Sequence, residues 1–272
     1  MYWVLLLFLL ICLFLYYENN KIDITNYNIS NTKVNGENIK IVQLSDLHCK
    51  SFGKNQKILV NKILNINPDL IFFTGDLVDA RTSVDNYVNS FTLIKELSKH
   101  FPIYFVSGNH EYKSYNEELI TKELNSSGAI ILDNIFAEIK VKNTNIKIFG
   151  FSYEPVTRNH KGTIDVLDSI KDTLDNNSLN ILLHHRPNNF YIFTYYNFDL
   201  IFCGHAHGGQ FRIPFIHKGI YMPDQGILPK FTEGIHTMNN SNMIISRGLG
   251  NSGFPIRLFN HPEIVVLTLK HK

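Results

Sequence analysis

The sequence predicts an α/β domain preceded by a single apolar helix. From Ile39 onward, short apolar runs of strand length alternate with segments of helical period, which is typical of α/β architecture. The short runs are rich in Ile, Val, Leu and Phe without strict alternation, as expected for strands that are buried on both faces. Setting aside the first 38 of the 272 residues leaves about 235. This length is enough for one large domain and too short for two domains of ordinary size.

The composition excludes several classes of protein. A hydrophobic content of 44% with a charged content of 18% is that of a folded chain and not of a disordered one. The 26 Lys and Arg residues nearly balance the 24 Asp and Glu residues and form no basic block, so we expect no nucleic-acid partner. Three cysteines are too few for a disulfide framework.

The first element, residues 2–17, predicts a membrane anchor. It contains no charge, no Gly and no Pro, and tyrosines flank it as they do at membrane interfaces. As a helix it would be about 24 Å long, slightly under the ~30 Å hydrocarbon core. A cleaved signal peptide would need a basic leader and a small-residue cleavage site, and neither is present. We therefore assign residues 1–17 to one N-terminal span, with the membrane face left open because few basic residues flank it.

The rest of the chain divides into a connector and a folded domain. Residues 18–38 are polar and rich in Asn and predict the connector, and residues 39–272 form the domain. Its strand candidates are 39–45, 70–74, 103–107, 146–149, 180–183, 200–203, 243–246 and 264–269. Its helix candidates are 55–66, 85–99, 116–126, 163–174 and 188–196. Residues 208–235 carry adjacent glycines and several prolines and predict an ordered irregular segment.

Polar side chains follow five of the strand candidates at the point where each strand ends. They are Asp46-Leu47-His48, Asp76, Asn109-His110-Glu111, His184-His185 and His205-Ala206-His207. Any one of these motifs alone is better explained as a turn former or a helix cap. All five at the same position relative to a strand favour one shared site, because ligands bind beyond the carboxyl ends of strands in open α/β sheets.

The residue types are those of a metal site with nitrogen and oxygen ligands. Imidazole suits Zn, Fe, Cu and Ni, whereas carboxylate and amide oxygens suit harder ions such as Mn. One ion needs three or four ligands, and about seven candidates are present, which fits two ions that share a bridging carboxylate. The sequence leaves the identity of the metal open.

In their order along the chain, these motifs resemble those of the calcineurin-like metallophosphoesterase superfamily over about residues 39–269. The segments that begin at His207-Gly-Gly-Gln, Pro223-Asp-Gln-Gly, Ser246-Arg-Gly-Leu-Gly and Arg257-Leu-Phe-Asn-His-Pro-Glu are similar to its bacterial membrane-anchored branch. That branch includes enzymes that act on phosphodiesters and on UDP-diacylglucosamine. The resemblance implies two packed mixed β-sheets flanked by helices, with metals at the strand ends and residues 39–272 as the catalytic domain.

The resemblance also implies a ligand set for two divalent ions, with Mn, Zn and Fe as the candidates. One ion would be held by Asp46, His48 and His207, the other by Asn109, His185 and His205, and Asp76 would bridge them. The family has one ligand histidine in the fourth motif, where this chain has His184 and His185. We choose His185, which directly precedes the Arg-Pro pair; His184 then falls on the opposite face of the strand end.

The predicted reaction is hydrolysis of a phosphate ester by a hydroxide that bridges the two metals. Two ions ~3.5–4 Å apart can activate water and clamp the attacking and leaving oxygens. His110 is the catalytic candidate. It would either donate a proton to the leaving oxygen or hold a phosphoryl oxygen of the substrate. The alternative is that His110 has no catalytic role and only orients Asn109. Arg186, Arg247 and Arg257 are candidates for gripping substrate phosphate, with the latter two preferred because they flank a Gly-rich stretch.

The anchor suggests the substrate class. A site tethered close to a bilayer favours a phosphodiester or pyrophosphate bond in a membrane, envelope or lipid-linked substrate. The alternatives are a phosphomonoesterase and a non-catalytic, membrane-tethered module that binds metal or phosphate. The second alternative has no need of His110 or of an open coordination position, whereas an enzyme needs both.

Overall fold

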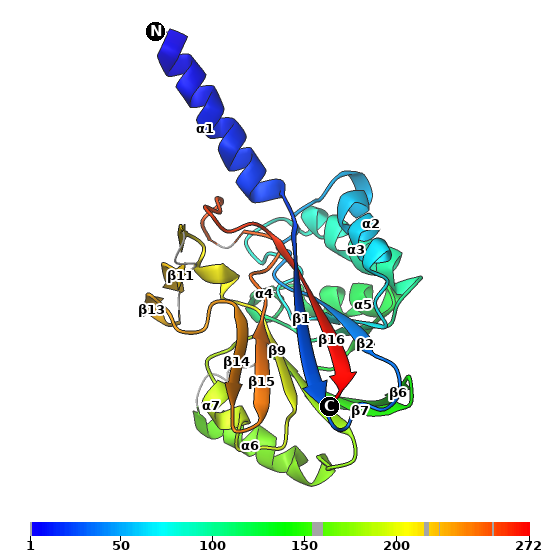
Figure 1. Cartoon of the computed structure of the whole chain (residues 1–272). Helices are drawn as coiled ribbons and strands as arrows, with labels where there is room; N and C mark the ends of the chain where they lie inside the picture. Colours follow the sequence, from blue (N-terminus) through cyan, green and yellow to red (C-terminus); the bar gives the residue numbers. More distant parts are fainter. Residues whose placement is uncertain (1, 154–159, 215–217, 223, 252) are drawn as a thin grey trace.

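The structure is a computed structural model that describes residues 2–153, 160–214, 218–222, 224–251 and 253–272. Two six-stranded mixed sheets pack face to face, and helices cover the outer face of each (Figure 1). Apolar side chains of both sheets, such as Ile41 and Phe72 of one and Ile148 and Phe202 of the other, fill the space between them. The fold class implied by the motifs is therefore confirmed.

The first sheet carries the first three of the predicted site motifs. Strands β2 to β5 run parallel, β16 is antiparallel to β2, and β1 is parallel to β16. The strands in spatial order are β1 (Asp23–Asn31), β16 (Glu263–His271), β2 (Ile39–Leu44), β3 (Leu70–Phe73), β4 (Ile103–Phe105) and β5 (Ala129–Ile131).

The second sheet carries the other two motifs. Strands β15, β9, β8 and β7 run parallel, and the outermost strands β14 and β6 are antiparallel to their neighbours. The strands in spatial order are β14 (Gly234–Met238), β15 (Ser241–Ile245), β9 (Leu200–Cys203), β8 (Leu179–His184), β7 (Thr144–Phe151) and β6 (Phe136–Val141).

The helices form the outer layers because each presents one apolar face to a sheet. In α2, Leu59 and Ile63 lie one turn apart and are fully buried against the first sheet. Helices α2 (Lys57–Ile66), α3 (Val88–Ser98) and α5 (Glu117–Ser126) cover the first sheet, and α6 (His160–Ile170) and α7 (Phe190–Phe193) cover the second. Helix α4 (Asn109–Lys113) directly follows β4. The five predicted helices are all present.

The expected connector contains a strand. Within residues 18–38, β1 pairs with β16 along its whole length, from Asp23 opposite Glu263 to Asn31 opposite His271. Alternate side chains of β1 are half-buried, and Tyr27 and Ile29 pack against the core between the sheets. The polar, Asn-rich composition hid this strand, since an edge strand with one exposed face buries few apolar side chains. The division of the chain at residue 39 stays a prediction.

Two segments project from the sandwich on the side of the site. Helix α1 (Tyr2–Asn20) points away from the domain (Figure 1), and nearly all of its large apolar side chains are exposed. It is long and apolar enough to cross a membrane. The predicted irregular segment 208–235 holds the short pairs β10 (Arg212–Ile213) with β11 (Lys218–Gly219) and β12 (Tyr221–Met222) with β13 (Gly226–Ile227); residues 215–217 and 223 lie outside the described residues.

Candidate metal centre

The turns after β2, β3, β4, β8 and β9 meet at one edge of the two sheets. Their side chains form three overlapping groups whose possible ligand atoms lie within 4.8 Å of one another. The groups are Asp46, His48 and His207; His48, Asp76 and His110; and Asp76, His185 and His205. The five motifs, whose first and last residues are Asp46 and His207, are thus brought together.

The first group combines one carboxylate with two imidazoles. The Nε2 atom of His207 lies 3.1 Å from Nε2 of His48 and 3.3 Å from Oδ1 of Asp46. All three side chains are buried. Two ring nitrogens and a carboxylate oxygen that converge in this way form the kind of donor set that a divalent cation takes from protein.

The group of Asp76, His185 and His205 lies next to the first, and its carboxylate also faces the first group. The Nε2 atom of His185 lies 3.2 Å from Oδ2 of Asp76 and 3.1 Å from Nδ1 of His205. The other ring nitrogen of His185 is 2.6 Å from the carbonyl oxygen of Thr74, a contact of the kind that orients metal-binding histidines. The same Oδ2 of Asp76 is 3.7 Å from Nε2 of His48, so one carboxylate oxygen faces both groups.

Two buried atoms of the cluster lack a partner among the described residues. They are the side-chain oxygen of Asn109, at the start of α4, and Nδ1 of His48. A buried polar atom without a hydrogen bond costs about 1–3 kcal/mol. The Asn109 oxygen is therefore well suited to a cation, and the donor set as a whole fits a pair of divalent ions.

The backbone around the cluster is strained. Asp46, His48, Asp76, His205 and His207 all have positive φ angles, between 47° and 68°. Such angles are uncommon outside glycine and concentrate at functional sites. The turns can approach one another because Gly75 lacks a side chain: a Cβ there would lie 2.6 Å from the backbone nitrogen of Gly108 and 2.7 Å from Nδ1 of His185.

Burial keeps three of the imidazoles neutral. It lowers the pKa of His48 to about 3 and that of His205 to about 4, and it holds the pKa of His207 well below its usual range. Neutral imidazole is the form that binds metal. Burial alone would raise the pKa of Asp76, but the charge and the hydrogen bond of the neighbouring His185 outweigh it and keep that pKa well below its usual range. Asp76 is therefore ionised at neutral pH.

Of the two adjacent histidines, His185 lies in the cluster. The ring of His184 lies against Phe193, and its Nδ1 atom is 3.2 Å from the carbonyl oxygen of Phe151, within the second sheet. Neighbouring residues at a strand end point to opposite faces, which explains the difference. The ligand role of His185 remains a prediction.

His110 lies at the side of the cluster with a partner that the sequence analysis missed. Its Nδ1 atom is 3.2 Å from Oδ1 of Asp79 and 3.1 Å from the backbone nitrogen of Ala80, and its ring meets that of His48 edge to face. Burial lowers the pKa of His110, but the hydrogen bond to Asp79 and the charges of Asp76 and Asp79 outweigh it, so the pKa is raised. The one sequence feature that could have indicated a role for Asp79 is its position three residues after Asp76, in the segment that follows the same strand.

Glu111 belongs to one of the five sequence motifs, but the sequence analysis assigned it no role. Its buried carboxylate accepts hydrogen bonds from the backbone nitrogens of Asp76, Val78 and Gly108, at 2.8 to 3.0 Å. It therefore ties the turn after β3 to the turn after β4. Only the folded backbone shows this function, because nothing in the sequence indicates which nitrogens face a carboxylate.

The two preferred arginines are engaged elsewhere. Arg247 is buried against the Glu263 carboxylate, with a nitrogen–oxygen distance of 3.0 Å. Arg257 is fully buried, donates to the backbone oxygens of Arg247 and Gly250, and lies 3.3 Å from Nδ1 of His207. Neither is among the described residues that line the cavity, so a direct grip on substrate phosphate finds no support in this geometry. The third candidate, Arg186, does line the cavity.

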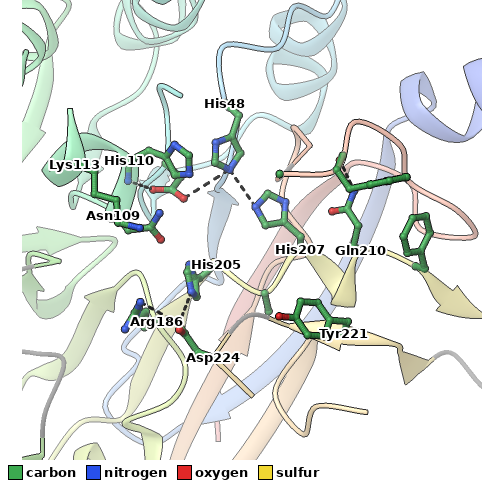
Figure 2. Close-up of a pocket in the computed structure, with 15 residues that line it drawn as sticks. His48, Asn109, His110, Lys113, Arg186, His205, His207, Gln210, Tyr221 and Asp224 are labelled. Carbon is green, nitrogen blue, oxygen red and sulfur yellow. Dashed lines mark hydrogen bonds and ion pairs between the residues drawn. The ribbon is translucent and has the colours of Figure 1, made fainter. Parts of the chain in front are cut away.

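A cavity of about 590 Å³ opens beside the cluster (Figure 2). The histidines His48, His110, His205 and His207 form one part of its wall, together with Asp76 and Asn109. Polar side chains form another part, where Arg186 and His205 both contact the Asp224 carboxylate, at 3.1 and 2.7 Å. Phe211, Tyr221 and Phe254 supply an apolar wall. The cluster thus has room for a substrate that carries more than a phosphate.

Comparisons with known proteins agree with this chemistry. A sequence model of the family described as calcineurin-like phosphoesterase matches residues 39–209. The chain is 28% identical to the uncharacterized metallophosphoesterase YkuE of Bacillus subtilis, over 94% of this chain and 88% of that one. It is 26% identical to the phosphodiesterase YaeI of Escherichia coli, over 93% and 90%. It is 24% identical to the UDP-2,3-diacylglucosamine pyrophosphatase LpxG of Chlamydia trachomatis, over 92% and 90%.

Proposed function

The chain belongs to the calcineurin-like phosphoesterase family and is a metal-dependent phosphoester hydrolase, and from this premise we propose that it cleaves a phosphodiester or pyrophosphate bond in a membrane-associated substrate. One observation carries the proposal. The Asp76 carboxylate lies between two groups of buried imidazoles, beside a cavity large enough for a phosphate with two substituents.

Seven side chains would hold the two ions. Asp46, His48 and His207 would bind one ion, Asn109, His185 and His205 the other, and Asp76 would contact both. When bound, divalent ions supply Lewis acidity and lower the pKa of water, so that hydrolysis proceeds at neutral pH. Manganese, zinc and iron all suit this mixture of imidazole, carboxylate and amide.

His110 supplies the proton that the reaction needs. Hydrolysis adds the oxygen of a water to phosphorus, breaks a bond from phosphorus to oxygen, and leaves an alkoxide or phosphate that must be protonated or stabilised. His110 lines the cavity, and its raised pKa favours the protonated ring that a proton donor needs. Asp79 holds the ring in place through Nδ1, which leaves Nε2 to face the leaving oxygen.

Cationic side chains that line the cavity would bind the remaining phosphate oxygens. Arg186 stacks on Tyr153, with its guanidinium carbon 4.4 Å from the ring centroid, and donates to the Tyr153 hydroxyl at 2.6 Å. This fixes one end of a planar donor that suits phosphate. Lys113, at the end of α4, lines the same cavity. Arg186, already a candidate from the sequence, and Lys113 would thus bind the phosphate in place of Arg247 and Arg257.

Two features support a substituted phosphate at a membrane over a phosphomonoester. Two relatives are named as a phosphodiesterase and as a pyrophosphatase of a diacylated sugar nucleotide. Helix α1, if it spans a bilayer, tethers the cavity to the membrane surface. A phosphomonoesterase is the second candidate, because the cluster itself does not distinguish the two ester types.

The test compares two aryl phosphates. Purified full-length protein is incubated with bis(p-nitrophenyl) phosphate and with p-nitrophenyl phosphate, in Mn²⁺ and after treatment with EDTA. We expect faster turnover of the diester, loss in EDTA, and recovery when the metal is returned. Asp76→Asn should lose the activity, whereas Asp172→Asn, a change at an exposed carboxylate, should keep it. Turnover that survives EDTA or Asp76→Asn would overturn the proposal, and preference for the monoester would favour the second candidate.

A further inference from the structure

Exposed apolar side chains gather at the mouth of the cavity. We call Ile220, Tyr221, Ile227, Leu228, Phe254 and Phe259 the apolar rim; each has between 39% and 78% of its surface exposed. Single exposed apolar residues are ordinary on a protein surface, but a contiguous group marks an interaction site. Tyr221 and Phe254 line the cavity as well, so the rim borders the site.

The rim is one surface built from two segments. Tyr221 pairs with Ile227 between β12 and β13, and the backbone nitrogen of Leu228 donates to the oxygen of Ile220 at 2.9 Å. Phe211 connects the second segment, residues 253–260, to the first. Its backbone oxygen accepts a hydrogen bond from the nitrogen of Ile220 at 2.8 Å, and the centroid of its ring lies 5.2 Å from that of Phe254. Phe211 also forms an isolated β-bridge with Leu258.

Helix α1 ends against this same surface. The ring of Phe14, on the apolar part of the helix, lies 5.9 Å from the ring of Phe259. Phe14 precedes the end of the helix at Asn20 by six residues, which is about 9 Å along the axis. Phe259 therefore lies beside the apolar part of the helix and not below it. Figure 1 shows the red segment before β16 next to the base of α1, with β11 and β13 on the same side.

Several polar contacts hold the helix at this position. The Asn19 side-chain oxygen accepts from the backbone nitrogen of Arg257 at 2.9 Å, and Lys50 donates to the Asn19 carbonyl oxygen. The buried Glu18 carboxylate lies 3.0 Å from the His261 ring. The helix and the rim are thus joined by specific contacts, and the position of one fixes the position of the other.

We propose that the apolar rim enters the bilayer that α1 spans, so that the cavity opens at the membrane surface and takes the phosphate of a lipid that stays in its leaflet. The apolar run of α1, about 24 Å as a helix, is shorter than the ~30 Å hydrocarbon core, which draws the domain close against the membrane. The statement about the lipid rests on the proposed function; the statement about membrane contact does not.

Contact between the apolar rim and the bilayer is tested by measuring how deeply single tryptophans on the rim enter the membrane. Trp3 is the only tryptophan of the chain, so Trp3→Phe gives a background in which Ile227→Trp, Phe254→Trp and Tyr195→Trp each report one position. Tyr195 follows α7, at the end of the domain away from α1, and is 83% exposed. The full chain is reconstituted in phosphatidylcholine vesicles with brominated acyl chains, and Trp3 of the unchanged protein reports whether α1 is inserted.

We expect bromine to quench tryptophan at positions 227 and 254 at least threefold more than at position 195, with emission shifted to the blue. Equal, weak quenching at all three positions while Trp3 is quenched would overturn the proposal. A blue shift at 227 that rises with protein concentration, without quenching by brominated lipid, would show a second copy on the rim and would also overturn the proposal.

The proposal that the substrate is a lipid in its leaflet is tested with two substrates and one double variant of the rim. Ile227→Asp with Leu228→Asp places charge on the rim at residues outside the cavity wall, and Tyr195→Asp is the matched control. We expect the double variant to cleave a nitrophenyl ester of phosphatidic acid in vesicles at least tenfold more slowly, and bis(p-nitrophenyl) phosphate in water at an unchanged rate.

The outcomes separate the two proposals. Equal rates of double variant and control on the vesicle substrate would overturn the role of the rim. If the wild-type protein cleaves the aryl diester and not the vesicle substrate, the proposal that the substrate is a membrane lipid is overturned. A wild-type protein inactive on both substrates would overturn the proposed function, and the quenching result would still decide whether the rim enters the bilayer.

Discussion

The side-chain oxygen of Asn109 is buried without a partner, and this predicts opposite effects of its removal with and without metal. In EDTA, Asn109→Ala should leave the free energy of unfolding unchanged or raise it by about 1 kcal/mol, because no hydrogen bond is lost. In Mn²⁺ or Zn²⁺ the variant should bind less metal than the wild type. Denaturant unfolding and elemental analysis measure the two effects.

The control for this prediction is Asn61→Ala, at an exposed position of α2. It should leave the metal content unchanged. Normal metal content in Asn109→Ala would mean that the amide is no ligand.

Asp79 predicts a change in pH dependence. Its hydrogen bond and charge raise the pKa of His110 against the effect of burial, so Asp79→Asn should lower that pKa. A proton donor with a lower pKa loses its proton at a lower pH, and the alkaline fall of kcat should therefore move to lower pH. The measurement is kcat against pH on the aryl diester, with Asp85→Asn, at an exposed carboxylate, as the control. An unmoved alkaline limb would show that His110 does not donate the proton.

At the residue scale, the sequence indicated the donors better than the groups that support them. Asp46, His48 and His207 stand in recognisable motifs after strands, and the fold needs only to bring strand ends together. Asp79 and Glu111 act through atoms whose neighbours exist only in the folded backbone. The carboxylate partner of Arg247, Glu263, could not be foreseen because it comes from a strand that follows Arg247 in the chain.

At the scale of elements, Glu111 links the turns that carry Asp76 and Asn109. Its carboxylate accepts from three backbone nitrogens, so Glu111→Gln places an amide NH₂ where an acceptor is needed. We expect the free energy of unfolding to fall by about 1–3 kcal/mol. Glu118→Gln, on the exposed side of α5, should change it by less than about 0.5 kcal/mol. Equal unfolding midpoints for the two variants would contradict this role.

Strand β1 predicts where the folded unit begins. Tyr27 and Ile29 pack against the core between the sheets, and all nine residues of the strand pair with β16. A chain that starts at Lys21 should therefore unfold at a clearly higher temperature than one that starts at Ile39. Calorimetry of the two truncated proteins measures the difference. Equal melting temperatures would support the boundary at residue 39.

The elements that the sequence revealed are those that bury one or both faces. The central strands and amphipathic helices were recognisable from periodicity, whereas β1, β5, β6, β14 and the short strands β10 to β13 were not. An edge strand of mixed polarity has little periodic signal, and a two-residue pair has none. Their positions depend on backbone pairing with distant segments.

At the scale of the whole molecule, the metal cluster joins the two sheets. Asp46, Asp76 and Asn109 follow strands of the first sheet, and His185 and His205 follow strands of the second. Ions at a hundredfold excess over Kd should stabilise the native state by about 2.7 kcal/mol. EDTA should then lower Tm by at least about 5 °C, and Mn²⁺ or Zn²⁺ should restore it. Scanning fluorimetry with and without chelator measures the shift, and an unchanged Tm would contradict metal binding at the cluster.

The parallel pairing of β1 with β16 has a consequence for biosynthesis. Asp23 cannot meet Glu263 until almost the entire polypeptide has left the ribosome. At typical rates of translation the delay is on the order of ten to fifty seconds. Throughout that interval β1 has an open edge next to the nascent apolar helix α1. The enzyme should therefore depend on chaperones that shield this unpaired segment until β16 has been synthesised.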